Sequence, residues 1–134
     1  SDHAGFKLKE KIKFFLLKKR KKVLDLGTNN TKAVDYPDYA HLLSSKIKKN
    51  NNQLGILICG SGIGMDMAAN RHKNIRAALC YDTKSARLSR KHNNANVMTI
   101  GARLTKKNVA LKCVNTFIKT NFDGGRHLRR VKKI

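Results

Sequence analysis

Short apolar runs alternate with amphipathic segments along this chain, and that alternation restricts the fold more than any other feature. The expected strands cover residues 54–59, 76–80 and 95–100, and the expected helices between and after them cover 65–70, 83–91 and 106–119. Parallel strands need long crossover connections, which helices usually supply. The sequence therefore predicts one α/β domain over residues 1–134, a Rossmann-like three-layer fold with a mostly parallel sheet.

The first third of the chain extends this pattern but begins irregularly. Residues 6–20 predict a helix, 23–26 a short strand, and 36–49 a second helix with Pro37 in its first turn. Asp2 stands directly before the first helix, where an α/β domain has normally just completed a strand. We therefore expect an N-terminal strand of about five residues to be absent, which would leave a gap in the sheet.

The charge is extreme: 30 Lys and Arg against 8 acids give a net charge of +22. Such a field attracts phosphates, nucleic acids and anionic membranes. The lysines are dispersed along the whole chain, with no aromatic-studded basic strand and no recognition-helix pattern, so a solvated surface is favoured over nucleic-acid binding. No apolar run approaches the roughly 20 residues of a membrane-spanning helix, so no membrane partner is expected.

The three cysteines, Cys59, Cys80 and Cys113, are too few and too scattered for a disulfide framework or a zinc site. Cys80 and Cys113 lie within apolar patterns that are typical of core positions. No signal peptide is visible. We expect a cytoplasmic protein that uses no metal and no cofactor.

Cys59 ends the most apolar strand and is followed by Gly60-Ser61-Gly62-Ile63-Gly64 and a helix start. Ligands of open parallel sheets bind at the carboxyl ends of the strands, and glycines let backbone amides approach an anion closely. The loop lacks the Gly-Lys-Ser/Thr ending of a nucleotide P-loop and the third glycine of a dinucleotide fingerprint. Taken alone, the motif fits a tight turn with an inert, buried cysteine equally well.

Three further motifs carry polar groups suited to a phosphorylated ligand. His92 follows a helix and could act as an acid or base, or could simply end that helix. Arg126 and Arg130 stand one helical turn apart, so a helix would place both on one face as a phosphate clamp; in so basic a chain they could equally be solvated surface groups. Asp2 could accept sugar hydroxyls or cap the first helix.

In their order and spacing, these motifs together resemble the ribose-5-phosphate isomerase type B family, which also includes galactose-6-phosphate isomerase subunits and an allose-6-phosphate isomerase. The resemblance spans Ser1 to about Val131. It is carried by residues 1–5, 27–28, 35–37, 59–64, 92–93, 96–97 and 124–127.

The resemblance implies a sheet of five parallel strands, a homodimer or tetramer, and an active site built from two subunits. It implies interconversion of ribose 5-phosphate and ribulose 5-phosphate through a cis-enediolate, without metal or nucleotide. A six-carbon sugar phosphate is the alternative substrate. A basic nucleic-acid-binding protein is the alternative from another class.

The resemblance also implies a role for each motif. Cys59 would be the base that moves the proton, His92 would open the furanose ring, and Asn93 would help to bind the substrate. The loop of residues 60–64, with the Ser61 hydroxyl, would stabilise the enediolate oxygens.

The remaining roles concern the two ends of the substrate. Asp2 and His3 would contact its sugar end and its phosphate end, respectively. Arg126 and Arg130 would hold the phosphate.

Overall fold

The computed structural model describes residues 1–47 and 52–134 and confirms the expected α/β architecture. Most elements begin and end within two residues of their expected bounds. The helix expected over 36–49 ends at Lys46, and residues 48–49 of that range lie outside the described part. In chain order the elements are α1 (Phe6–Lys18), α2 (Tyr36–Lys46), β1 (Gly55–Cys59), α3 (Ile63–Ala69), β2 (Ala77–Leu79), α4 (Thr83–Asn93), β3 (Val97–Gly101), α5 (Lys107–Lys119) and α6 (Gly125–Val131).

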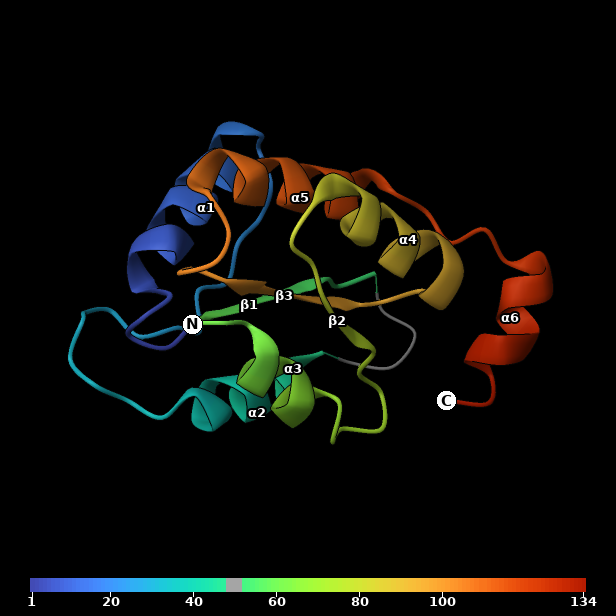
Figure 1. The fold of residues 1–134 in the computed structure, drawn as a ribbon, viewed down its shortest axis with the longest axis horizontal. Helices are drawn as coiled ribbons and strands as arrows, with labels where there is room; N and C mark the ends of the chain where they lie inside the picture. Colours follow the sequence, from blue (N-terminus) through green and yellow to red (C-terminus); the bar gives the residue numbers. More distant parts are fainter. Residues whose placement is uncertain (48–51) are drawn as a thin grey trace.

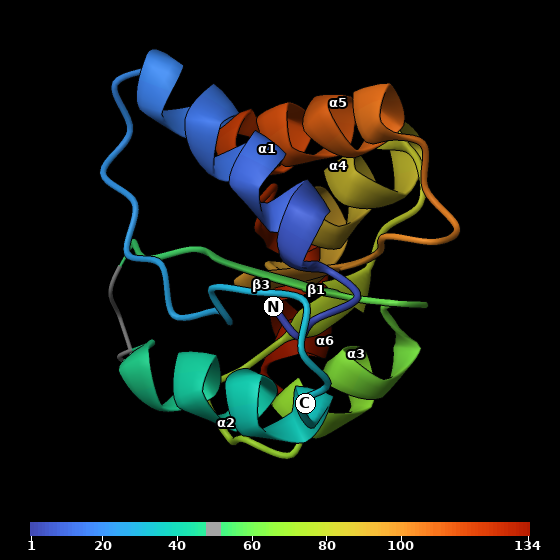
Figure 2. The same cartoon turned by 90° about the vertical axis from the view of Figure 1, so that its left-hand side faces the viewer.

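The sheet lies between two helical layers. Its three strands are parallel in the order β1-β3-β2, with Gly55 of β1 and Ala77 of β2 both opposite Val97 of β3. Helices α1, α4 and α5 cover one face, and α2 and α3 cover the other (Figures 1 and 2). In the described part of the chain, no helix is long and apolar enough to cross a membrane.

The alternation of side chains along β1 decides which layer receives Cys59. Ile58 packs into the cluster formed with α1 and α5, while Leu57 and Cys59 pack into the cluster formed with α2 and α3. Successive residues of a strand point to opposite faces of the sheet, so this division follows directly from the register of β1. The Cys59 sulfur therefore lies on the side where α3 begins.

The strand expected over residues 23–26 is not formed, and that prediction was wrong. A strand needs a hydrogen-bonded neighbour, and a groove of about 850 Å³ separates this segment from β1. Among the described residues, backbone hydrogen bonds bridge the groove at the carboxyl end of the sheet, where Asp2 N–H donates to the Ile58 carbonyl (3.3 Å) and Thr28 N–H donates to the Ser1 carbonyl (3.0 Å).

A charged cluster fastens the segment beyond this groove to α1. The Asp25 carboxylate lies 2.7 Å from Lys9 Nζ and 3.0 Å from Lys13 Nζ, and it also accepts the Gly27 N–H at 3.0 Å. Partial burial acts to raise the pKa of Asp25, but the two ammonium groups and the amide outweigh it and lower the pKa to about 2. The cluster positions Gly27 next to Ser1.

We predict that Asp25→Asn lowers the free energy of unfolding by about 1 kcal/mol at pH 7. Because the folded-state pKa of Asp25 lies below its ordinary value of 3.8, this stabilisation is present above that pH and is lost as the pH falls toward 2. Urea unfolding at both ends of this range measures the effect. Asp35→Asn is the control, since the Asp35 side chain makes no capping bond to α2. A difference between Asp25→Asn and wild type that persists unchanged at pH 2 would contradict the prediction.

Candidate active site

The loop from β1 to α3 is pressed against the end of β3. Gly62 has φ of 83°, and a Cβ atom there would lie 2.8 Å from the Gly101 nitrogen and 2.8 Å from the Ile100 carbonyl carbon. A left-handed backbone conformation with backbone atoms this close admits only glycine. Packing therefore requires glycine at position 62, which is one of the alternating glycines of the sequence.

This packing directs a backbone amide at the Cys59 sulfur. Gly62 N–H donates to Cys59 Sγ at 3.1 Å, and the Cys59 side chain is 4% exposed. The hydrogen bond fixes the sulfur against the loop. Beside it, the Ser61 hydroxyl oxygen accepts the Ile63 N–H at 3.3 Å, at the start of α3. The loop thus holds both polar groups at the start of α3.

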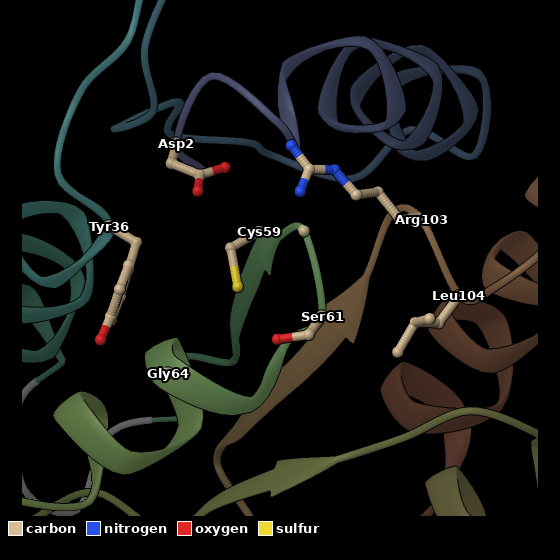
Figure 3. Close-up of a pocket in the computed structure, with 8 residues that line it drawn as sticks. Asp2, Tyr36, Cys59, Ser61, Gly64, Arg103 and Leu104 are labelled. Atoms are coloured by element: carbon tan, nitrogen blue, oxygen red, sulfur yellow. The ribbon is translucent and has the colours of Figure 1, made fainter.

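A cavity of about 270 Å³ opens above this loop. Figure 3 shows Cys59 and Ser61 at its centre, Tyr36 and Leu104 on opposite sides, and Asp2 and Arg103 above them. The cavity unites one thiol, the hydroxyls of Ser61 and Tyr36, one carboxylate and one guanidinium, which suits a small polar anion. The lining residues are Asp2, Tyr36, Cys59, Gly60, Ser61, Gly64, Arg103 and Leu104.

Asp2 lies in the turn before α1 and is not the helix cap that the sequence offered as one reading, since the N-cap is Gly5 and no described side chain caps the helix. Its Oδ1 accepts the Gly5 N–H at 2.9 Å, which forms the turn leading into α1. The residue is 5% exposed, and its carboxylate also lines the cavity (Figure 3). The turn thus holds the carboxylate at the rim of the cavity.

Arg103 and Tyr36 line the cavity but were not identified as site residues from the sequence. The backbone N–H of Arg103 donates to the Gly60 carbonyl (3.0 Å), and that of Ala102 donates to the Cys59 carbonyl (2.8 Å). These two hydrogen bonds join the turn after β3 to the loop after β1. Arg103 follows a predicted strand closely, so its place at the carboxyl edge could have been inferred. The Tyr36 ring packs on Gly64, a contact between α2 and α3 that carries no sequence signal.

His92, Asn93, Arg126 and Arg130 lie outside this cavity, at the junction of α4 and α6. The His92 ring stacks on His127, with centroids 4.2 Å apart and planes 7° apart. In Figure 1, α6 lies at the right-hand end of the long axis, well away from the N-terminus. The strand β1, which carries Cys59, ends beside the N-terminus. The structure therefore separates these four predicted site residues from the cavity around Cys59 within one chain.

The α4–α6 junction is strongly cationic. Desolvation, together with the neighbouring His92, Arg126 and Arg130, lowers the pKa of His127. Both arginines are exposed on α6, and this helix meets the condition under which their spacing places them on one face. This junction can bind an anion, but it needs a further surface to enclose one.

His3 occupies a third position. Its Nδ1 lies 3.2 Å from both the backbone nitrogen and the carbonyl oxygen of Val34. The half-buried ring thus holds the segment that leads into α2. It is not among the residues that line the cavity.

A thiol and an amide-rich loop at the carboxyl edge of an open parallel sheet define the class of α/β proteins that bind small ligands at this edge. Comparison with known families is more specific. The Ribose/Galactose Isomerase family matches residues 1–134, and the chain belongs to this family.

Individual relatives are similar over nearly the whole chain. Ribose-5-phosphate isomerase B of Escherichia coli is 39% identical over 133 residues, which cover 99% of this chain and 89% of that protein. The crystal structure of a ribose 5-phosphate isomerase from Thermotoga maritima is 52% identical, with a TM-score of 0.95 over 99% of this chain and 92% of that one. Ribose-5-phosphate isomerase B from Mycoplasma genitalium, with bound ribulose-5-phosphate, is 48% identical, with a TM-score of 0.95 over 99% and 89%.

We predict that Gly62→Ala displaces the loop, whereas Gly60→Ala does not. A Cβ at position 62 meets backbone atoms, while one at position 60 meets only the flexible Arg103 side chain, at 3.3 Å or more. Gly62→Ala should cost more than about 1 kcal/mol of folding stability, and Gly60→Ala less than about 0.5 kcal/mol. Thermal unfolding of both variants measures the difference. Equal melting temperatures would show that the loop does not need glycine at position 62.

Proposed function

We propose that this chain is an aldose–ketose isomerase that interconverts D-ribose 5-phosphate and D-ribulose 5-phosphate. The observation that carries the proposal is the Cys59 sulfur, which accepts the Gly62 amide inside a small polar cavity. Membership of the Ribose/Galactose Isomerase family supports it. So does the relative from Mycoplasma genitalium whose structure contains ribulose-5-phosphate.

Cys59 is the proton carrier in this proposal. Its thiolate removes the proton from C2 of the open-chain aldose, which leaves a cis-enediolate, and then returns that proton to C1. The hydroxyl proton passes from O2 to O1, and the ketose results. A positioned base contributes roughly 10²- to 10⁴-fold to the rate of such a step. The sulfur begins and ends the cycle in the same protonation state, so no other reactant is consumed.

The loop stabilises the charge that develops on the substrate oxygens. The loop of residues 60–64 and the Ser61 hydroxyl supply donors at the start of α3, where the helix dipole adds positive potential. Two of its amides, those of Gly62 and Ile63, are already bonded to the Cys59 sulfur and the Ser61 oxygen. Asp2 accepts sugar hydroxyl groups, and Arg103 supplies a cation within the cavity. The charge of +22 attracts the anionic substrate.

A second copy of the chain completes the site. The α4–α6 junction supplies His92 for ring opening, Asn93 for substrate binding, and Arg126 and Arg130 for the phosphate, in the cavity of the partner. Large apolar side chains exposed near the carboxyl edge of the sheet support this homodimer, because dimer interfaces bury such groups. They are Ile63 (46% exposed), Met67 (61%), Tyr81 (66%) and Leu104 (72%). The three unpaired cysteines support a cytoplasmic location.

We predict that Cys59→Ala and Cys59→Ser each lower kcat by at least about 10²-fold, because neither side chain can act as the base. Both variants should still bind ribose 5-phosphate. Exchange of the C2 hydrogen with deuterated water, followed by NMR, measures the step directly. Cys113→Ala, a thiol change in α5, is the control and should retain turnover. Hydrogen exchange at the wild-type rate in either Cys59 variant would remove Cys59 from this role.

We predict that the double variant Arg126→Ala, Arg130→Ala raises KM for ribose 5-phosphate, because the phosphate loses both guanidinium groups. Mixing it with Cys59→Ala should restore about a quarter of wild-type activity. Half of the random dimers are then mixed, and each mixed dimer has one intact site of two. Gel filtration verifies that both variants remain dimeric. The assay is run at a substrate concentration far below the raised KM, where the double variant alone is nearly silent. If the mixture of two dimeric variants is then no more active than the separate variants, the site is not shared between subunits.

The substrate is tested with sugar phosphates of two lengths. We expect turnover of ribose 5-phosphate to exceed that of galactose 6-phosphate and allose 6-phosphate. The reverse order would assign the chain to a six-carbon substrate. Salt-sensitive binding to oligonucleotides, in the absence of any isomerase activity, would instead favour a nucleic-acid-binding protein.

A further inference from the structure

Asp66 is a half-buried acid that is held by neutral groups in a chain with 30 Lys and Arg residues. Its Oδ1 accepts the Thr99 hydroxyl at 3.0 Å, and its Oδ2 accepts the Asn70 side-chain amide at 3.3 Å. Burial raises the pKa of Asp66, and these two hydrogen bonds oppose that rise. The carboxylate thus forms hydrogen bonds with neutral groups inside the fold, although cationic side chains are abundant in the chain.

Both partners of Asp66 belong to the sheet or are fixed to it. Thr99 is fully buried in β3, the central strand, opposite Leu57 of β1 and Leu79 of β2. Asn70 pairs with the backbone of Ala77, accepting its N–H at 2.8 Å and donating to its carbonyl at 3.1 Å. Asp66 therefore joins the first turn of α3 to β3 and, through Asn70, to β2.

The first turn of α3 is also the support of the Cys59 loop. Asp66 N–H donates to the Gly62 carbonyl at 3.2 Å, and Gly62 N–H donates to the Cys59 sulfur at 3.1 Å. Consequently, a rotation or shift of this turn would move the Gly62 peptide group relative to the sulfur. The Thr99–Asp66 hydrogen bond opposes such a movement, because it ties this turn to β3, the central strand of the sheet.

We propose that Asp66 is a positioning residue: through its bond with Thr99 it fixes the first turn of α3, and thereby sets the Gly62 amide against the Cys59 sulfur. Asp66 itself does not line the cavity. The significance of this positioning for turnover rests on the proposed function, in which Cys59 is the base. The positioning itself can be measured without a substrate.

Thr99→Val tests the proposal because it removes the hydroxyl, keeps the size and β-branching of the side chain, and leaves the charge of Asp66 in place. With the Gly62 amide displaced, the Cys59 sulfur loses the hydrogen bond that holds it at the cavity. We expect the rate of Cys59 alkylation by iodoacetamide, followed by peptide mass spectrometry, to fall about 5- to 10-fold. The kcat for ribose 5-phosphate should fall about 10-fold, with KM within about 2-fold of wild type.

Asp66→Asn is the matched variant, because it removes the charge and the bond from Asn70 but keeps an oxygen that can accept the Thr99 hydroxyl. We expect alkylation of Cys59 and kcat to stay within about 2-fold of wild type. Ser89→Ala removes another buried hydroxyl, from α4 on the opposite face of the sheet, and controls for general destabilisation. It should lower the melting temperature without changing the alkylation rate of Cys59.

The outcomes separate the possible causes. If Thr99→Val alkylates like wild type, the proposal is overturned. If Asp66→Asn slows alkylation as much as Thr99→Val does, the effect belongs to the carboxylate charge or to the Asn70 bond, and positioning through Thr99 is again overturned. If alkylation changes as expected while Cys59→Ala retains isomerase activity, the positioning holds and the proposed catalytic role of Cys59 fails.

Discussion

The close contact between the loop after β1 and the end of β3 is the constraint on which the rest of the site depends. Gly62 and Gly101 face each other there, and a Cβ on Gly101 would collide with the Ser61 carbonyl. Only this contact lets the Gly62 amide reach the Cys59 sulfur at 3.1 Å. The same contact sets where α3 begins, so the thiol, the amides and the helix N-terminus form one packed unit rather than three independent features.

Three of the few acids in this basic chain stabilise the segments around this packed unit. Asp25 fastens the segment before Gly27 to α1 through two lysines. Asp2 closes the turn into α1 while its carboxylate lines the cavity. Asp66 joins α3 to the sheet through neutral partners. Each carboxylate organises backbone near the cavity, and the excess of cations leaves the overall field favourable to an anionic ligand.

Most of the fold could be predicted because strand and helix periodicity are local properties of the sequence. The prediction failed over residues 23–26, where an apolar run of strand-forming residues stays unpaired. Pairing depends on a neighbour across the groove, and periodicity contains no information about neighbours. The same limit applies to Tyr36 and Arg103, which reach the cavity through contacts with Gly64 and Gly60 that link distant parts of the chain.

The sequence by itself determined the α/β class, the position of Cys59 at the end of a buried strand, and the glycine spacing that follows it, since these depend on residues close together in the chain. Only the tertiary structure decided that Asp2 and Arg103 join Cys59 in one cavity, while His92 and Arg126 lie at the α4–α6 junction. The physical reason is that a motif fixes local geometry, whereas the packing of helices on both faces of the sheet fixes the distances between motifs.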